Sequence, residues 1–302
     1  MPIYPNFYQT LSACPIVELR GYAAANGLKG RLYAYLDFGG PTGTARDGLA
    51  EGMLALTIEQ KKLAPGQPII EASSGAFATA LTLAGLTAGH PVVLVMPEDA
   101  PALRQENLLR LGAQIRHSPA RSGPAGARTL AEQTAAANGW YYMNWLANDD
   151  NPEYHRRVTG PAIVHSIARE KASLVDAVTI GVGSGGTITG VGETIKAWTN
   201  DVRIVAVEPF ECQALTGGVL GPHSIPDIGF GLVPKNFNTY VVDNVAAVSS
   251  KDAQRAAQQV LRTDAIPASA SAGAALHAAA KLVANGISHS ALAVFSGRTV
   301  LL

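Results

Sequence analysis

The sequence predicts an α/β protein with two sets of parallel strands, and three observations lead to this prediction. Short apolar segments alternate with segments of helical spacing along most of the chain. That alternation is typical of a parallel sheet with helices on both faces. The series occurs twice, before and after about residue 150, and a glycine-rich loop follows a strand of the second series. We therefore expect two open-sheet α/β lobes with a cleft between them that holds the site.

The composition is that of a soluble globular protein. The 302 residues are 47% hydrophobic, which is enough for one large core or two moderate ones. Lys and Arg together number 23, as do Asp and Glu, so the balanced charge gives no footprint for nucleic acid or an anionic membrane. The sequence has two distant cysteines, no visible secretory signal and no apolar run of membrane-spanning length. We therefore expect the protein in the reducing cytoplasm.

The first series starts with a strand at 31–38 that enters a Gly/Pro-rich loop at 39–48. Apolar spacing and the helix-ending residues Pro65, Gly89 and Gly112 predict the elements that follow. They are a helix at 45–63, a strand at 69–72, a helix at 76–88, a strand at 92–96, a helix at 101–111, a strand at 114–117, a mobile loop at 119–126 and a helix at 127–138.

The second series is predicted by the same alternation. Its elements are a helix at 157–171, a strand at 177–181, a helix at 187–199, a strand at 202–207, helices at 251–262 and 272–285 and a strand at 291–295. The segment 210–240 is rich in Gly and Pro and lacks periodicity, so we expect it to fold over something rather than to form core.

A glycine-rich loop directly follows the strand at 177–181, and it is a candidate phosphate cradle. Its members are Gly183, Ser184, Gly185, Gly186 and Thr187. Glycines let a backbone approach an anion closely, and the N-terminus of the next helix offers unpaired N–H groups and a positive dipole end. One alternative is that the loop is a structural turn that binds no ligand. A dinucleotide-binding loop with Glu208 as its ribose-binding acid is another, although this loop lies behind a complete α/β lobe.

Several motifs along the chain resemble those of the cysteine synthase and cystathionine beta-synthase family, the fold type II pyridoxal-phosphate (PLP) enzymes. Pro41-Thr42-Gly43-Thr44 with Asp47 is similar to that family's Pro-Thr-Gly-Ser-x-Lys-Asp, and Gly183 to Thr187 is similar to its Gly-Thr-Gly-Gly-Thr phosphate cup. Ser271-Ala272-Gly273 fits the Ser-x-Gly whose Ser accepts the pyridine nitrogen. Further matches are Asn151-Pro152, His155, Thr159-Gly160-Pro161, Val207-Glu208-Pro209, Gly221-Pro222-His223 and Ile228 to Pro234.

The resemblance implies a tryptophan synthase beta-like architecture and a homodimer. The larger lobe, with the phosphate cup, would comprise 1–40 and 151–302, and a smaller mobile lobe would comprise 41–150. It also assigns a set of residues to the substrate side of the site. They are Ser73, Ser74, Gly75, Ala76, Phe77, Trp145 and Asp227.

The chain departs from the family pattern on that side, most of all at Arg46, which stands where the family has the lysine that forms the imine with PLP. A guanidinium stays protonated and cannot attack an aldehyde as a neutral amine does. Ala76 and Phe77 lack the amide and hydroxyl of the family's loop, and Trp145 and Asp227 stand where a Gln and a Gly are usual. None of the eight lysines lies near 39–48 in sequence, which leaves open a lysine brought close by folding.

Two interpretations of these departures remain open. Arg46 is either an ordinary ion-paired residue or a partner for an anion held by the cup. Phe77 and Trp145 either fill the vacated subsite as core or form the wall of a more apolar pocket. Three histidines, His155, His165 and His223, lack metal-ligand spacing, so we expect structural roles for them and no metal.

Three functions follow. The favoured one is a diverged family member that binds a phosphorylated or otherwise anionic small molecule, or PLP non-covalently, and runs a repurposed reaction. The second is PLP-dependent β-replacement or elimination on an O-activated serine or a similar amino acid, which loss of the lysine disfavours because both the covalent anchor and the base are missing. The third is a non-catalytic regulatory or scaffold partner of an active paralogue.

Overall fold

The chain divides into two compact units, which are described separately. The computed structural model describes residues 3, 6–12, 14–169 and 175–299. The larger unit comprises Met1–Ala45 and Asn151–Leu302, and the smaller unit comprises Arg46–Asp150. Among the described residues, no helix has both the length and the apolar character needed to cross a bilayer.

A six-stranded sheet forms the centre of the larger unit. Its strands, in spatial order, are β1 (Ile16–Glu18), β2 (Arg31–Leu36), β10 (Ser290–Phe295), β7 (Ala177–Gly181), β8 (Arg203–Pro209) and β9 (Asn244–Val248). Every neighbouring pair is parallel except β1 and β2. The prediction of an all-parallel sheet is therefore wrong at this edge, where the chain turns back through α1 (Arg20–Ala25) to begin β2.

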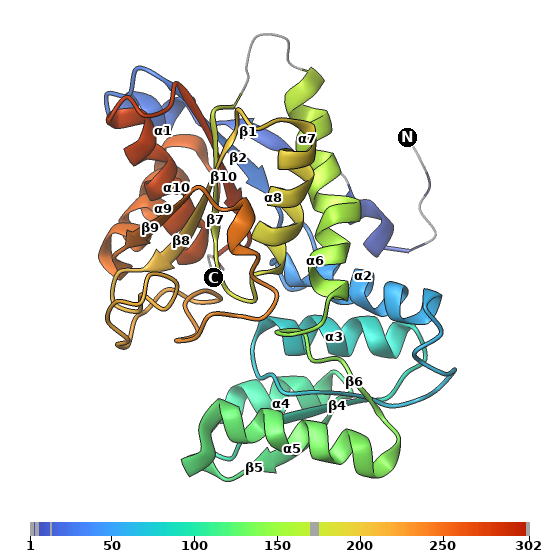
Figure 1. Cartoon of the computed structure of the whole chain (residues 1–302). Coiled ribbons are helices and arrows are strands. Elements are labelled where there is room, and N and C mark those ends of the chain that lie inside the picture. The colour runs from blue at the N-terminus through green and yellow to red at the C-terminus, as the bar shows by residue number, and fades with distance from the viewer. Residues whose placement is uncertain (1–2, 4–5, 13, 170–174, 300–302) are drawn as a thin grey trace. The chain divides into compact units, whose positions relative to one another are not determined.

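Helices cover both faces of this sheet, as the alternation predicted (Figure 1). On one face α1, α9 (Ser250–Asp264) and α10 (Ala270–Ala284) pack in one apolar cluster with β2 and β10. On the other face lie α7 (Gly160–Arg169) and α8 (Gly186–Trp198). Helices α9 and α10 approach very closely at Gly273, where an added Cβ would lie 2.1 Å from the carbonyl oxygen of Ala253.

The smaller unit has a four-stranded parallel sheet with helices packed against it. The strand order is β5 (Gln114–Ser118), β4 (Val92–Pro97), β3 (Ile69–Glu71) and β6 (Tyr141–Tyr142). Its helices are α2 (Arg46–Glu59), α3 (Ala76–Thr87), α4 (Ala102–Arg110) and α5 (Gly123–Asn138). Alanines of α5 pack on Ile70, Val93 and Val95, whose apolar side chains lie on the two central strands.

Two predictions of local structure are corrected. The segment 119–126 is not a loop, because a 3₁₀ turn, η2 (Ala120–Ser122), leads into α5 at Gly123. Pro124 lies in the first turn of α5, where a missing N–H costs nothing. The helix expected at 157–171 is α6 (Asp150–Tyr154), a π-helical turn η3 (His155–Thr159) and α7, and residues 170–171 lie outside the described residues.

The remaining segments are irregular or short. Residues 210–238 form no named helix or strand, and η4 (Thr239–Val241) follows them. The expectation that the segment 210–240 forms no core is wrong, because Ile225 and Ile228 are buried in an apolar cluster with side chains of β8, β9, α9 and α10. A short 3₁₀ helix, η1 (Tyr8–Ser12), precedes β1.

Candidate ligand-binding site

The glycine-rich loop after β7 is held in a shape that only glycine allows. Gly185 has φ +83°, and a Cβ on it would lie 2.9 Å from the backbone nitrogen of Phe237. A Cβ on Gly186, the first residue of α8, would lie 1.7 Å from Oδ1 of Asn151. The glycines thus let the loop pack against two other segments while α8 begins with unpaired amide donors. This is the geometry of an anion cradle at a helix N-terminus.

Two side chains from the segment before α7 orient the hydroxyls of this loop. Asn151 Nδ2 donates to Ser184 Oγ at 3.1 Å. The His155 ring lies with Nε2 3.1 Å from Thr187 Oγ1 and with Nδ1 2.8 Å from Thr159 Oγ1. His155 is fully buried and lies at the start of the π-helical turn. These contacts let Asn151 and His155 fix the positions of Ser184 and Thr187 in the glycine-rich loop, a contact that the sequence assignment of His155 as structural did not specify.

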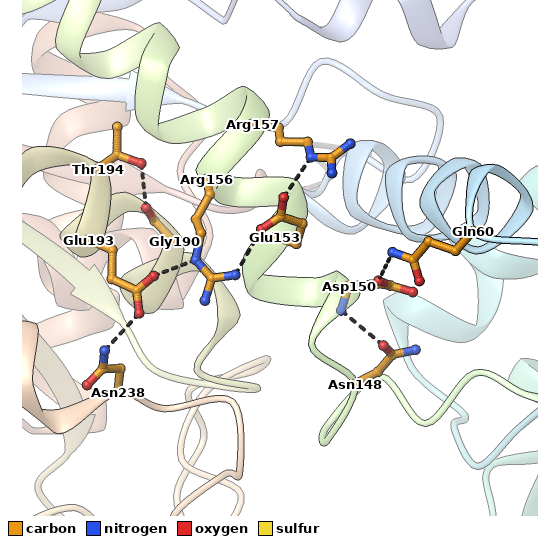
Figure 2. Close-up of polar contacts among 10 residues, drawn as sticks. All are labelled: Gln60, Asn148, Asp150, Glu153, Arg156, Arg157, Gly190, Glu193, Thr194 and Asn238. Carbon is orange, nitrogen blue, oxygen red and sulfur yellow. Dashed lines mark hydrogen bonds and ion pairs between the residues drawn. The ribbon is translucent and has the colours of Figure 1, made fainter. Parts of the chain in front are cut away.

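Side chains from three segments form further polar contacts with α8, beyond the glycine-rich loop (Figure 2). The Arg156 guanidinium pairs with Glu153 at 3.0 Å and with Glu193, and Glu193 accepts from Asn238 Nδ2 at 2.7 Å. Burial opposes the ionisation of Glu193, but the hydrogen bonds from Arg156 and Asn238 outweigh it and lower the pKa of this carboxyl. The carboxylate therefore stays ionised and ties the 236–238 loop to α8.

The threonine Thr189 adds another tie between the same loop and α8. Its hydroxyl donates to the Asn236 carbonyl at 2.7 Å and accepts from the Asn238 N–H at 2.9 Å. Because Phe237 lies between these two residues and against Gly185, the position of the loop is set on both sides of that contact.

Ser271 and the loop that starts at Asp227 meet the same end of β7. A Cβ on Gly181 would lie 3.0 Å from Ile228 Cγ2 and 3.9 Å from the Ser271 carbonyl oxygen. Ser271 is 2% exposed, and its hydroxyl lies 2.9 Å from that of Ser269, the N-cap of α10. Asp227 has φ +66°, a conformation that favours glycine. This matches the sequence interpretation that Asp227 occupies a position suited to Gly.

Glu208 has a structural role, which removes the basis of the dinucleotide alternative. The residue is 1% exposed. Its carboxylate accepts from the Leu215 N–H at 2.7 Å and from the Thr216 hydroxyl at 2.6 Å. The carboxylate is therefore engaged in shaping the segment after β8, and it is not presented to a ribose.

In the smaller unit the structure brings three predicted site residues together. The Phe77 and Trp145 rings are stacked, with centroids 4.6 Å apart and planes inclined by 11°. The Cζ atom of Arg46, at the start of α2, lies 5.3 Å from the centroid of the Trp145 ring. Arg46 and Trp145 are each 6% exposed and Phe77 is 2% exposed. We refer to these three residues as the Arg46/Trp145/Phe77 cluster.

A buried carboxyl group that belongs to none of the sequence motifs holds Trp145 in place. Glu71 ends β3 and is 1% exposed. It accepts from the Trp145 N–H at 3.0 Å and from the Ala72 N–H at 2.7 Å. Burial raises the pKa of Glu71 to about 7, although the N–H donors act in the opposite direction. The one signal in the sequence is an acid at the end of an otherwise apolar strand.

The Ser73-Ser74-Gly75 loop connects Glu71 to α3. Gly75 is the N-cap of α3 and so supplies no capping side chain, and a Cβ on it would meet nothing within 4 Å. Ala76 opens the helix, and Phe77 turns inward from its first turn onto Trp145. Ser73 and Ser74 are partly exposed.

The two lysines of the smaller unit lie far from Arg46. The unit contains Lys61 and Lys62, which follow the far end of α2. At 1.5 Å per residue that end is about 20 Å from the first residue of the helix. Lys62 lies there 3.8 Å from Asp150. Among the described residues there is also no cluster of three or more His, Cys, Asp or Glu side chains that could hold a metal ion.

Comparisons with known proteins identify the family. The model of the family described as "Pyridoxal-phosphate dependent enzyme" matches residues 9–297. The chain belongs to this family. A cysteine synthase of Staphylococcus aureus is 31% identical over 274 residues, which are 91% of this chain and 87% of that protein. This family membership confirms the resemblance drawn from the motifs.

Solved structures of relatives confirm the fold type II architecture. The O-acetyl serine sulfhydrylase isoform 3 of Entamoeba histolytica has a TM-score of 0.91 at 30% identity, over 98% of this chain and 89% of that one. An O-ureido-L-serine synthase has a TM-score of 0.91 at 26% identity, over 98% of this chain and 92% of that one.

Proposed function

We propose that this chain is a diverged family member that binds a phosphorylated or otherwise anionic small molecule in the inherited cup and does not hold PLP through an imine. The observation that carries the proposal is the burial of Arg46 over the Trp145 ring, at the position that the resemblance gives to the imine lysine. A buried guanidinium stacked on an indole can pair with an anion but has no free amine to offer.

The residues of the larger unit fit a phosphate group. Gly185 and Gly186 leave no room for side chains, and the backbone N–H groups at the start of α8, which have no partner within the helix, are the donors that a phosphate would use. Ser184 and Thr187 add hydroxyls that Asn151 and His155 orient. When PLP is bound to such a cup, its phosphate anchors the cofactor, and the aldehyde supplies the electron-withdrawing chemistry. The cup therefore suits PLP bound non-covalently as well as other phosphorylated ligands.

The residues of the smaller unit do not fit the imine-forming half of the family's chemistry. Arg46 cannot form the bond, and the lysines of this unit lie beyond the far end of α2. Phe77 and Trp145 fill their surroundings with stacked rings rather than with amide or hydroxyl donors for a carboxylate. We therefore derive no PLP-dependent step for this chain.

A second candidate is PLP-dependent β-replacement or elimination on an O-activated serine or a similar amino acid. The relatives favour it, because the ones that match over most of the chain include a cysteine synthase and an O-acetyl serine sulfhydrylase. It requires a lysine of the larger unit to form the imine.

By analogy with the family we also propose a homodimer in the cytoplasm.

Binding and reduction experiments separate these candidates. The full-length protein is titrated with PLP, with pyridoxal and with inorganic phosphate, and the PLP complex is then reduced with borohydride. We expect PLP to bind, phosphate to compete, pyridoxal to bind weakly and reduction to leave the protein mass unchanged. A reduced adduct on a lysine would overturn the proposal in favour of β-replacement, and failure of PLP and phosphate to bind would favour a non-catalytic partner of an active paralogue.

A matched pair of variants on α8 locates the binding. Thr187→Val removes a cup hydroxyl, and Thr194→Val makes the same change on the same helix, where the hydroxyl bonds the Gly190 carbonyl instead. We expect Thr187→Val to weaken PLP and phosphate binding by about tenfold, the cost of one hydrogen bond to a charged group, and Thr194→Val to leave it unchanged. Equal effects would show that the ligand lies elsewhere.

A further inference from the structure

The larger unit has a second hollow surface that the proposed function does not use. Two neighbouring hollows, of about 970 Å³ and about 190 Å³, share Asn26, Leu28 and Ala284 in their walls. They lie where α1 and α10 end and where β2 and β10 begin. We call this surface the α1/α10 groove.

The α1/α10 groove is separate from the phosphate cup. The cup follows the carboxyl end of β7, whereas Arg31 and Ser290, in the wall of the larger hollow, are the first residues of β2 and β10. These strands are parallel neighbours in the order β2, β10, β7. The groove and the cup therefore lie at opposite ends of the same strands, about 17–20 Å apart for strands of this length.

Helical spacing directs cationic side chains into the smaller hollow. Arg255 and Gln259 are four residues apart on α9, as are His277 and Lys281 on α10, so each pair lies on one helix face. Tyr22 and Asn26 close the hollow from α1 and its C-cap. The larger hollow adds Lys29, Arg31 and His289. Among the described residues that line the two hollows there is no carboxylate.

The acidic groups nearby are already bonded. Asp252 pairs with Arg255 at 2.6 Å and accepts from the Ser249 hydroxyl. Asp176 accepts from the backbone N–H groups of His289 and Ser290, and Asp264 accepts from those of Gly21 and Tyr22. These carboxylates reduce the net charge of the region without entering the walls of the hollows.

The C-terminal ends of α1 and α10 at the groove repel an anion less than helix ends with unsatisfied carbonyl groups would. The last turn of α1 is closed by N–H groups of Asn26, Gly27 and Leu28, which bond the carbonyls of Tyr22, Ala23 and Ala24. The last turn of α10 is closed in the same way by N–H groups of residues 285–288. Carbonyls satisfied in this way present less negative potential to the groove.

Ser288 is a buried polar residue at the wall of the larger hollow. The residue lines the larger hollow and is 4% exposed. Its Oγ is buried and has no hydrogen-bond partner among the described residues. Buried polar atoms are nearly always satisfied, so a hydroxyl without a partner beside a cationic hollow is an unusual feature of this surface.

We propose that the α1/α10 groove binds a small organic anion with at least two negative charges, of the phosphate-bearing class. One charged group would pair with Arg255 and Lys281 in the smaller hollow, and another with Lys29 and Arg31 in the larger one. Paired cations at both ends select a multiply charged ligand over a single carboxylate. The apolar side chains of Leu28 and Val283 provide contact for the uncharged part between the two groups.

Binding of pyrophosphate, of ADP and of citrate to the full-length protein tests the proposal. The three probes separate a bare diphosphate, an organic diphosphate and a polycarboxylate. The double variant Arg255→Gln/Lys281→Gln is compared with Lys251→Gln, which removes an exposed cation at the start of the same α9 but lies outside both hollows. We expect at least one phosphate-bearing probe to bind, the double variant to weaken it by about tenfold or more, and Lys251→Gln to leave it unchanged.

The His277 resonance gives a readout that does not depend on the variants folding. Burial lowers the pKa of His277, and Arg255 and Lys281 act in the same direction against the opposing charge of Asp252. A bound anion beside this ring should raise its pKa, so the NMR titration of His277 should move to higher pH when the probe is present. The inference is overturned if no probe binds at millimolar concentration or if citrate alone binds. It is also overturned if the double variant Arg255→Gln/Lys281→Gln binds the probe as tightly as the native protein.

These outcomes are independent of the phosphate cup. Thr187→Val should weaken binding of PLP to the cup and leave binding of the probe at the groove unchanged. If Thr187→Val abolishes probe binding, the probe occupies the cup and the groove proposal fails, while the proposed function stands.

Discussion

The Trp145 indole stacks on the Phe77 ring with the two centroids 4.6 Å apart and the planes 11° from parallel. The two residues are 68 positions apart in sequence, and they meet because Phe77 is in the first turn of α3 while Trp145 follows β6. Arg46 lies over the same indole. The smaller unit thus places an aromatic pair and a buried cation where the resemblance expects groups that handle an amino acid.

The aromatic pair should contribute measurable coupling to stability. Phe77→Ala removes a ring that is 2% exposed and should lower the free energy of unfolding by about 3–5 kcal/mol. Phe77→Leu, which keeps most of the volume, should cost much less. A double-mutant cycle with Trp145→Leu, followed by urea unfolding, should give a coupling energy of about 0.5–1.5 kcal/mol. Additive effects would mean that the rings fill space without interacting.

Arg46→Lys tests whether the arginine alone prevents imine chemistry. The lysine side chain is cationic when protonated, like arginine, but its neutral amine form can react with an aldehyde. With PLP added, we expect a yellow species that borohydride fixes to residue 46, as mass spectrometry of the peptide would show. Arg46→Gln, which has no amine, is the control. If the Lys variant stays colourless, the aromatic pair excludes the cofactor as well.

Much of the fold could be predicted because it depends on local patterns. The strands that become β2, β3, β4, β7 and β10 are short apolar runs, and their bounds match the structure to within two residues. The antiparallel β1 and the two-residue β6 carry too few residues to show a period. The π-helical turn at His155 could not be predicted either, since its backbone hydrogen bonds span only one residue more than those of an α-helix.

The candidate site also has a part that local sequence predicts and a part that depends on the folded chain. The glycine-rich loop could be recognised from sequence as a candidate phosphate cup, because glycines at a strand-to-helix junction have a local meaning. Contacts such as His155 with Thr187, or Glu71 with the Trp145 N–H, join residues 32 and 74 positions apart and depend on the folded chain. The composition of a strand end cannot reveal that one carboxyl group will be buried there.

Gly186→Ala tests how tightly the cup is built. The new Cβ would lie 1.7 Å from Asn151 Oδ1, so Asn151 must move and release the Ser184 hydroxyl. We expect a loss of about 1–3 kcal/mol in the free energy of unfolding and a loss of phosphate binding. Gly75→Ala is the stability control, because it lies at another helix N-terminus where a Cβ meets nothing within 4 Å. Comparable destabilisation by both would show that the clash is relieved cheaply.

Glu71 should make stability depend on pH in the direction opposite to an ion-paired acid. Burial raises its pKa from 4.5 to about 7 in the folded chain, so between these values the folded state binds more protons than the unfolded state. The free energy of unfolding must therefore fall as pH rises from about 4.5 to 7, by at most about 3 kcal/mol from this group.

Urea unfolding of the native protein and of Glu71→Gln across that pH range measures this contribution. Gln cannot ionise, so the free energy of unfolding of Glu71→Gln should lack the part of the pH dependence that comes from Glu71. The amide also changes the hydrogen bond with the Trp145 N–H, and this adds a cost that does not vary with pH. Comparing slopes rather than absolute stabilities removes that constant cost. Parallel pH profiles for the two proteins would show that Glu71 titrates alike in the folded and unfolded chains, and that a hydrogen-bonded carboxylate persists beside Trp145 without a penalty from burial.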